Sequence, residues 1–167
     1  MASVSELVSE DIAGLRSFVL EAWRLAGRSA LGWTGATDEN IEKITSESFL
    51  QQFIRNPSIK VFISKKGEKV VGFCATRKMD DRAVELAGII VRQDQIGKGI
   101  GTDLFERARK EATRSGFTTM LVKTEPTNDR ALHFYRRKGF AENKQIVEEI
   151  SGAEVKLAVL KLTLKKE

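Results

Sequence analysis

Three glycines within five positions mark the part of the sequence best suited to hold a ligand. They are Gly97, Gly99 and Gly101, in the stretch QIGKGIG at residues 95–101. Glycine has no side chain to keep a ligand away, so successive backbone N–H groups can approach an anion. From Ile100 onward apolar residues recur at every fourth position, as in an amphipathic helix. Because a helix N-terminus carries unpaired N–H groups and a positive dipole end, this spacing predicts a phosphate site.

Two familiar phosphate-binding loops do not fit this stretch. The NTP-binding P-loop would require glycine at Arg92 and serine or threonine at Gly99. The dinucleotide fingerprint would require a third small residue at Thr102 and a position at the start of a βαβ unit. Binding of a nucleoside triphosphate or a dinucleotide is therefore disfavoured. The loop either binds another phosphate ligand or is a plain glycine turn.

One carboxylate lies in the apolar run before the loop. Glu85 is the sole charged residue of AVELAGIIV, residues 83–91. Strict strand alternation would place it on one face with three apolar residues, Ala87, Ile89 and Val91. Burial there would make the carboxylate a stronger base, suited to accept a proton from a substrate. The alternative is a carboxylate at a strand end that faces water or pairs with a neighbour such as Arg82.

Other reactive side chains are sparse. Cys74 is the single cysteine and lies in the apolar run VVGFCAT, which indicates a buried thiol and allows no internal disulfide. His133 is the single histidine and is expected on a helix surface, so no metal site is predicted. Basic residues gather in FYRRKGF, residues 134–140, either as a solvated helix end or as a landing site for phosphate.

The elements that would position these residues follow from hydrophobic periodicity. Helices are predicted at residues 9–26, opened by a Ser/Asp cap, and at 38–56, 100–112 and 128–139. Strands are predicted in a hairpin across 59–79 and at 82–91, 118–124, 140–150 and 153–164. This layout is mixed α/β.

Bulk composition limits the class of protein. With 167 residues and 41% hydrophobic content, residues 2–166 are expected to form one domain. No signal stretch or membrane-spanning run is recognised, so a cytoplasmic protein without a membrane partner is expected. The net charge of +5 suits an anionic ligand but falls short of a basic stripe, and the aromatic residues lie at core-like spacings. Nucleic acid is therefore not expected as a partner.

Two motifs together carry a resemblance to a known family. The loop pattern [QR]-x-x-G-x-[GA] falls on Ile96–Gly101, and N-x-x-A-x-x-F-Y-x-x-x-G-F is matched in full from Asn128 to Phe140. With the order strand, loop, helix, strand and helix, residues 84–140 resemble the GNAT superfamily of acetyl-CoA-dependent N-acetyltransferases. Ile96 departs from the pattern, and Gln95 stands one place before it.

The resemblance implies a fold and a reaction. The fold is a central mixed, mostly antiparallel sheet flanked by helices, with a splayed strand pair that forms the CoA cleft. The reaction is transfer of an acetyl group from acetyl-CoA to a primary amine by direct attack in a ternary complex. A non-catalytic acyl-CoA sensor on the same fold is the alternative. The acceptor is left open between small molecules and protein amines, and the oligomeric state between monomer and homodimer.

The resemblance also implies roles for individual residues. Glu85 falls where the family often places a general base, and Tyr135 matches the tyrosine that gives a proton to the CoA sulfur. Tyr135 could instead only pack beside Phe134 and Phe140, and Asn128 could serve only as a helix cap. The residues expected to contact the cofactor are Ile89, Ile90, Val91, Gly97, Lys98, Gly99, Ile100, Gly101, Thr102, Asn128 and Tyr135.

Residues that the two motifs do not specify could also lie near the ligands. Arg136 and Lys138 could join Lys98 near the CoA phosphates. The segment GRSALGWTGATDEN, which holds Trp33 and Asp38, would line the acceptor site in the family's geometry. Trp33 could equally pack a helix junction.

Overall fold

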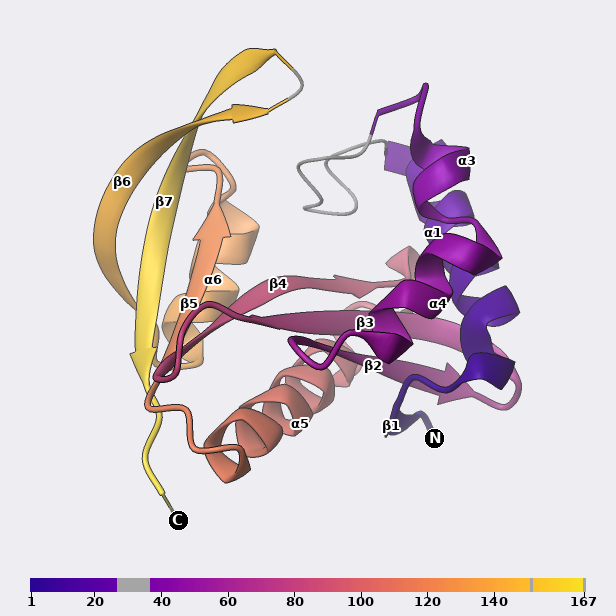
Figure 1. The fold of residues 1–167 in the computed structure, drawn as a ribbon, viewed down its shortest axis with the longest axis horizontal. Coiled ribbons are helices and arrows are strands. Elements are labelled where there is room, and N and C mark those ends of the chain that lie inside the picture. Colours follow the sequence, from indigo (N-terminus) through magenta and orange to yellow (C-terminus); the bar gives the residue numbers. More distant parts are fainter. Residues whose placement is uncertain (27–36, 151, 167) are drawn as a thin grey trace.

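A single seven-stranded sheet runs through the protein, whose computed structural model describes residues 1–26, 37–150 and 152–166 (Figure 1). The strand order is β1-β2-β3-β4-β5-β7-β6. Every neighbouring pair is antiparallel except β4 with β5, which is parallel. The predicted mixed, mostly antiparallel sheet is therefore confirmed. The strands are β1 (Ser3–Glu6), β2 (Ile59–Lys66), β3 (Lys69–Lys78), β4 (Ala83–Val91), β5 (Thr119–Thr124), β6 (Ala141–Ile150) and β7 (Ala153–Thr163).

Helices cover both faces of this sheet and enclose two cores (Figure 1). On one face lie α1 (Ile12–Ala26), α3 (Ile41–Ile44) and α4 (Glu47–Arg55), where Phe18 meets Phe73 of β3 edge to face. On the other lie α5 (Ile100–Arg114) and α6 (Asp129–Arg137), whose apolar residues join one core with the sheet. The β6–β7 hairpin curves away from the rest of the sheet beyond β5 (Figure 1).

The N-terminal helices differ from the prediction at their starts and in continuity. Residues 9–11 form a 3-10 turn without a side-chain cap, and Ser9 Oγ instead donates to Gln51 Oε1 at 3.4 Å. The helix predicted at 38–56 is two helices, because Thr45 Oγ1 bonds back to a carbonyl and Ser46 caps the following helix. Strand β1 has only four residues, which is too few for the sequence to show an alternation.

A bulge in β4 changes which residues share a face with Glu85. Ala75 pairs with Gly88 while Thr76 pairs with Leu86, so Ala87 is an extra residue in β4. An extra residue reverses the alternation beyond it. Glu85 therefore lies on the face of Gly88 and Ile90, towards α1, and the prediction that it lies with Ala87, Ile89 and Val91 is wrong. Ile89 and Val91 pack against the core on the α5 side.

The parallel pair of strands separates partway along its length. Pairing between β4 and β5 ends at Leu86 and Val122, although β4 continues to Val91. Among the residues that the structure describes, no strand pairs with the remaining residues of β4 on that edge. This is the splayed pair that the resemblance implied, and it opens the sheet directly before the glycine loop.

Candidate active site

The glycine loop keeps its backbone open at the start of α5. Gly97 and Gly99 have φ angles of 80° and 84°, in the left-handed region that other residues rarely adopt. Gly99 is the N-cap residue of α5, which is 15 residues long and has no side-chain cap there. The first N–H groups of the helix therefore have no capping side chain, as a backbone site for an anion requires.

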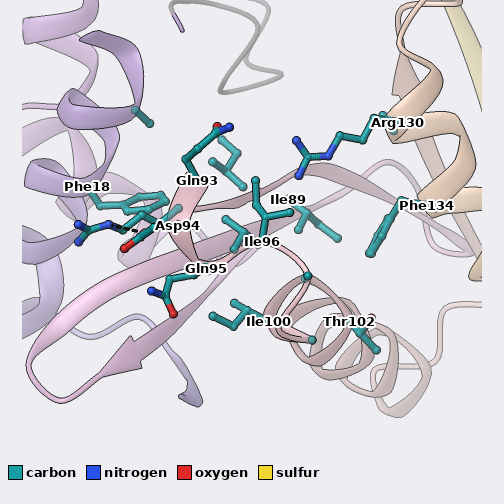
Figure 2. Close-up of a pocket in the computed structure, with 18 of the residues that line it drawn as sticks. Phe18, Ile89, Gln93, Asp94, Gln95, Ile96, Ile100, Thr102, Arg130 and Phe134 are labelled. Atoms are coloured by element: carbon teal, nitrogen blue, oxygen red, sulfur yellow. Dashed lines mark ion pairs between the residues drawn. The ribbon is translucent and has the colours of Figure 1, made fainter. Parts of the chain in front are cut away.

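A cavity of about 910 Å³ lies between this loop, the end of β4, α1 and α6 (Figure 2). Small-molecule pockets span roughly 300–1,000 Å³, so the cavity has room for a large ligand. All the residues predicted to contact the cofactor line it except Lys98, whose Nζ atom donates to Gln95 Oε1 at 3.5 Å. The structure thus brings together two segments that the sequence separates by more than twenty residues.

Backbone amides of β4 point into the opened edge of the sheet. Arg92 N donates to Val71 O at 2.8 Å, on the side of β3. Because amide directions alternate along an extended strand, the N–H of Ile90 points the same way. Those of Ile89 and Val91 point to the splayed side. These two amides can donate to a ligand that enters between β4 and β5.

Tyr135 brings a phenol to the wall of the cavity. It packs edge to face against Phe134 and Phe140, with ring centroids 5.5 and 5.6 Å away. Burial, and to a lesser extent the nearby Cys74 thiol, raises the pKa of Tyr135 to about 12. The hydroxyl therefore keeps its proton at neutral pH and can donate it. The ring therefore packs as one alternative expected, and its role as a proton donor stays a prediction.

The cationic residues at the cavity differ from those named on sequence grounds. Arg130 and Arg137 line it, and Figure 2 shows the Arg130 guanidinium reaching from α6 towards Ile96 and Ile89. Arg136 instead pairs with Glu142, outside the cavity. Lys138 Nζ donates to Thr102 Oγ1 at 2.8 Å and does not line the cavity either.

Only a weak pattern in the sequence indicates that Arg130 and Arg137 reach the cavity. Arg130 falls at a variable position within the second motif, and only the helical spacing of α6 indicates that it shares a side with Phe134 and Arg137. Ile96 is 38% exposed and faces the cavity, so the departure from the loop pattern places an apolar side chain in the ligand's surroundings (Figure 2).

Glu85 lies apart from the cavity, in a charged row that also includes Arg77, Lys123 and Glu148. Its side chain is 8% exposed, and Oε2 accepts from the Arg77 guanidinium at 2.5 Å. The Lys123 ammonium lies 3.9 Å from Oε1. The expected alternative partner, Arg82, makes no ion pair with it among the described residues. Glu85 is therefore a buried, charge-paired carboxylate on the face that α1 covers.

The remaining candidates have structural partners. Asn128 Oδ1 accepts from Ala131 N at 3.1 Å, so it caps α6, and it also lines the cavity. Cys74 is buried, and burial raises the pKa of its thiol to about 12, so it is inert as a nucleophile. Asp38 Oδ1 accepts from Trp23 Nε1 at 2.7 Å, while Trp33 lies outside the described residues.

Known N-acetyltransferase structures share this architecture. The PaiA N-acetyltransferase of Thermoplasma acidophilum in complex with coenzyme A aligns with a TM-score of 0.75, at 19% identity over 98% of this chain and 99% of that one. The ribosomal-protein-S18-alanine N-acetyltransferase of Escherichia coli gives 0.72 at 17% identity, over 100% and 96%. The spermidine/spermine N-acetyltransferase SpeG of Vibrio cholerae gives 0.71 at 18%, over 98% and 95%. At such identities the likeness shows the fold.

Sequence comparison defines the family. The profile of the acetyltransferase (GNAT) family matches residues 21–140, which is most of the chain. The protein belongs to the GNAT acetyltransferase family. No curated protein sequence matches the chain. Within the described residues, no helix combines the length and the apolar character needed to cross a membrane.

Proposed function

We propose that the protein transfers an acetyl group from acetyl-CoA to a primary amine by direct attack in a ternary complex. The observation that carries this proposal is the cavity at the splayed end of β4, because it joins an open-backbone glycine loop to a protonated phenol. Acetyl-CoA, when bound, supplies the activated acetyl thioester. Family membership and the structures aligned above support this donor.

The chain's own groups divide the work of binding. The loop amides and the start of α5 hold phosphate, and the Arg130 and Arg137 guanidinium groups approach the same ligand from α6. The amides of Ile89 and Val91 hold and polarise the thioester carbonyl, since hydrogen bonds to that oxygen strengthen as negative charge develops on it. Residue 96 contributes apolar contact in place of a polar side chain.

Two side chains move protons. A cationic amine cannot attack until it loses a proton, and Glu85 of β4 is a buried carboxylate that can accept one. Glu85 does not line the cavity, so the proton reaches it through water rather than by direct contact with the amine. Tyr135 gives its proton to the departing thiolate sulfur, because its hydroxyl remains protonated at neutral pH.

The test combines binding and turnover. CoA and acetyl-CoA at millimolar concentration should raise the melting temperature, because a ligand that binds only the folded state stabilises it by mass action. A panel of amines, scored by release of CoA thiol, should then yield at least one acceptor. The panel holds peptides with free N-termini, lysine peptides, polyamines, amino acids and aminoglycosides. No shift with CoA removes the proposal, whereas a firm shift without thiol release across the panel supports the acyl-CoA sensor.

A further inference from the structure

The charged row crosses the sheet from β3 to β6 through alternating charges. Arg77 is bonded to Glu85 at 2.5 Å, and Lys123 lies between Glu85 at 3.9 Å and Glu148 at 2.5 Å. The side chain of Glu148 is 35% exposed and that of Lys123 is 26% exposed, against 8% for Glu85. From the buried Glu85, the row therefore becomes more exposed towards Glu148 on the β6–β7 hairpin.

The two oxygens of Glu85 have different surroundings. Oε2 is held by the Arg77 guanidinium, which fixes the carboxylate in place. Oε1 faces the Lys123 ammonium at 3.9 Å, which is too long for a hydrogen bond. That ammonium donates instead to Glu148 Oε1 at 2.5 Å. Glu148 thus competes with Glu85 for the same cation and holds it.

We propose that Glu148 is a positioning residue for acetyl transfer, and that it keeps the Lys123 ammonium away from Glu85 Oε1. This rests on the proposed function, in which Glu85 is the general base. The proton leaves the acceptor ammonium, through water, for Oε1. The freed nitrogen lone pair then forms the C–N bond as the C–S bond breaks. An ammonium bonded to Oε1 would block the water path and stabilise the carboxylate against protonation.

The electrostatic effect is large because Glu85 is buried. A cation that moves from 3.9 Å to hydrogen-bond distance interacts more strongly with a carboxylate in a poorly solvated site than with one in water. Two further cations share this face by register: Lys161 of β7, opposite Leu121, and Lys144 of β6, opposite Val159. Both are exposed, and neither forms an ion pair with Glu85 among the described residues.

Three variants of the full chain test the competition: Glu148→Met, Lys123→Met and the double variant. Each is assayed for turnover against pH with the acceptor found in the amine panel. Glu148→Met should lower kcat by roughly tenfold and move the acid limb of the pH profile to lower pH, with acetyl-CoA affinity unchanged. The double variant should regain the kcat of Lys123→Met to within about twofold, since no ammonium is left to move onto Oε1. Glu142→Met, which removes another β6 carboxylate, should leave the profile unchanged.

Two results overturn the positioning role. One is an unaltered pH profile in Glu148→Met. The other is a double variant as slow as Glu148→Met, which would assign the loss to folding or acceptor contact. Carbon-13 NMR titration of the Glu85 carboxyl carbon, identified by its loss in Glu85→Gln, keeps the test separate from the proposed function. Glu148→Met should move that titration to lower pH even if the protein acetylates nothing, whereas full turnover in Glu85→Gln would refute the base and leave this titration standing.

Discussion

Around the cavity, the candidate cofactor site draws on two continuous segments, 89–102 and 128–137, whereas the charged row takes one side chain from each of four strands. The cofactor side relies mainly on backbone groups, which a short motif with glycine at fixed places can specify. The row relies on side chains that only the register of the sheet brings together. The difference explains why a sequence motif can indicate the candidate cofactor loop, whereas no single segment indicates the partners of Glu85.

Glu85→Gln should have the largest effect. The change keeps shape and removes basicity, so turnover should fall by the roughly 10²- to 10⁴-fold typical of a general base. The affinity for acetyl-CoA, measured by calorimetry, should stay nearly constant, because Glu85 does not line the cavity. Unchanged turnover at neutral pH would mean that Glu85 is not the base, so the charged row would have no part in proton removal.

Tyr135→Phe should come next and should act on the chemical step. Loss of the proton donor should lower kcat by about ten- to a hundredfold, since a thiolate is already a fair leaving group. The pKa of about 12 means that Tyr135 keeps its proton as pH rises past 10, so its ionisation should cause no loss of activity below about pH 11. Equal rates for both proteins in single-turnover experiments would leave the phenol only its packing role.

Gly99→Val tests the backbone nature of the cofactor side. Its φ of 84° strains any side chain by roughly 1–2 kcal/mol, and the valine side chain would occupy open space where Gly99 lines the cavity. In Gly99→Val, we expect most of the rise in melting temperature with CoA to be lost. Gly67→Val, at a φ of 61° in the β2–β3 turn, supplies the same strain away from the cavity. An equal loss of the CoA shift in both variants would attribute it to general instability.

Arg130→Gln should have the smallest effect. It tests which basic residue contacts the CoA phosphates. Affinity for CoA should weaken by about tenfold at low salt, in line with loss of one charge-assisted contact, and less at high salt. Affinity for an acetylated pantetheine that lacks the phosphates should not change. Arg136→Gln is the matched control, because Arg136 pairs with Glu142 outside the cavity. A larger loss in the control would reverse the assignment.

Local pattern determined most of the fold by itself. The hairpin of β2 and β3, the strands β4 to β7 and the helices α5 and α6 all follow from periodicity and glycine placement, because each signal lies within one short segment. The glycine loop and the second motif indicated the cavity wall and the donor. Periodicity did not indicate the helix break at Thr45, because the side-chain bonds to the backbone that interrupt the helix involve only two residues.

Tertiary structure alone decided what surrounds the candidate base. One extra residue at Ala87 moved Glu85 to the opposite face from the one that simple alternation gives, and a bulge of this kind is defined by pairing with β3. Sheet order then set Lys123 beside Glu85 and brought Glu148 to Lys123 from a strand that is not adjacent to β5. The packing of α6 likewise places Arg130 and Arg137, and not Arg136, at the cavity. Contacts between residues far apart in the chain leave no local periodic signal, because they depend on how whole elements pack.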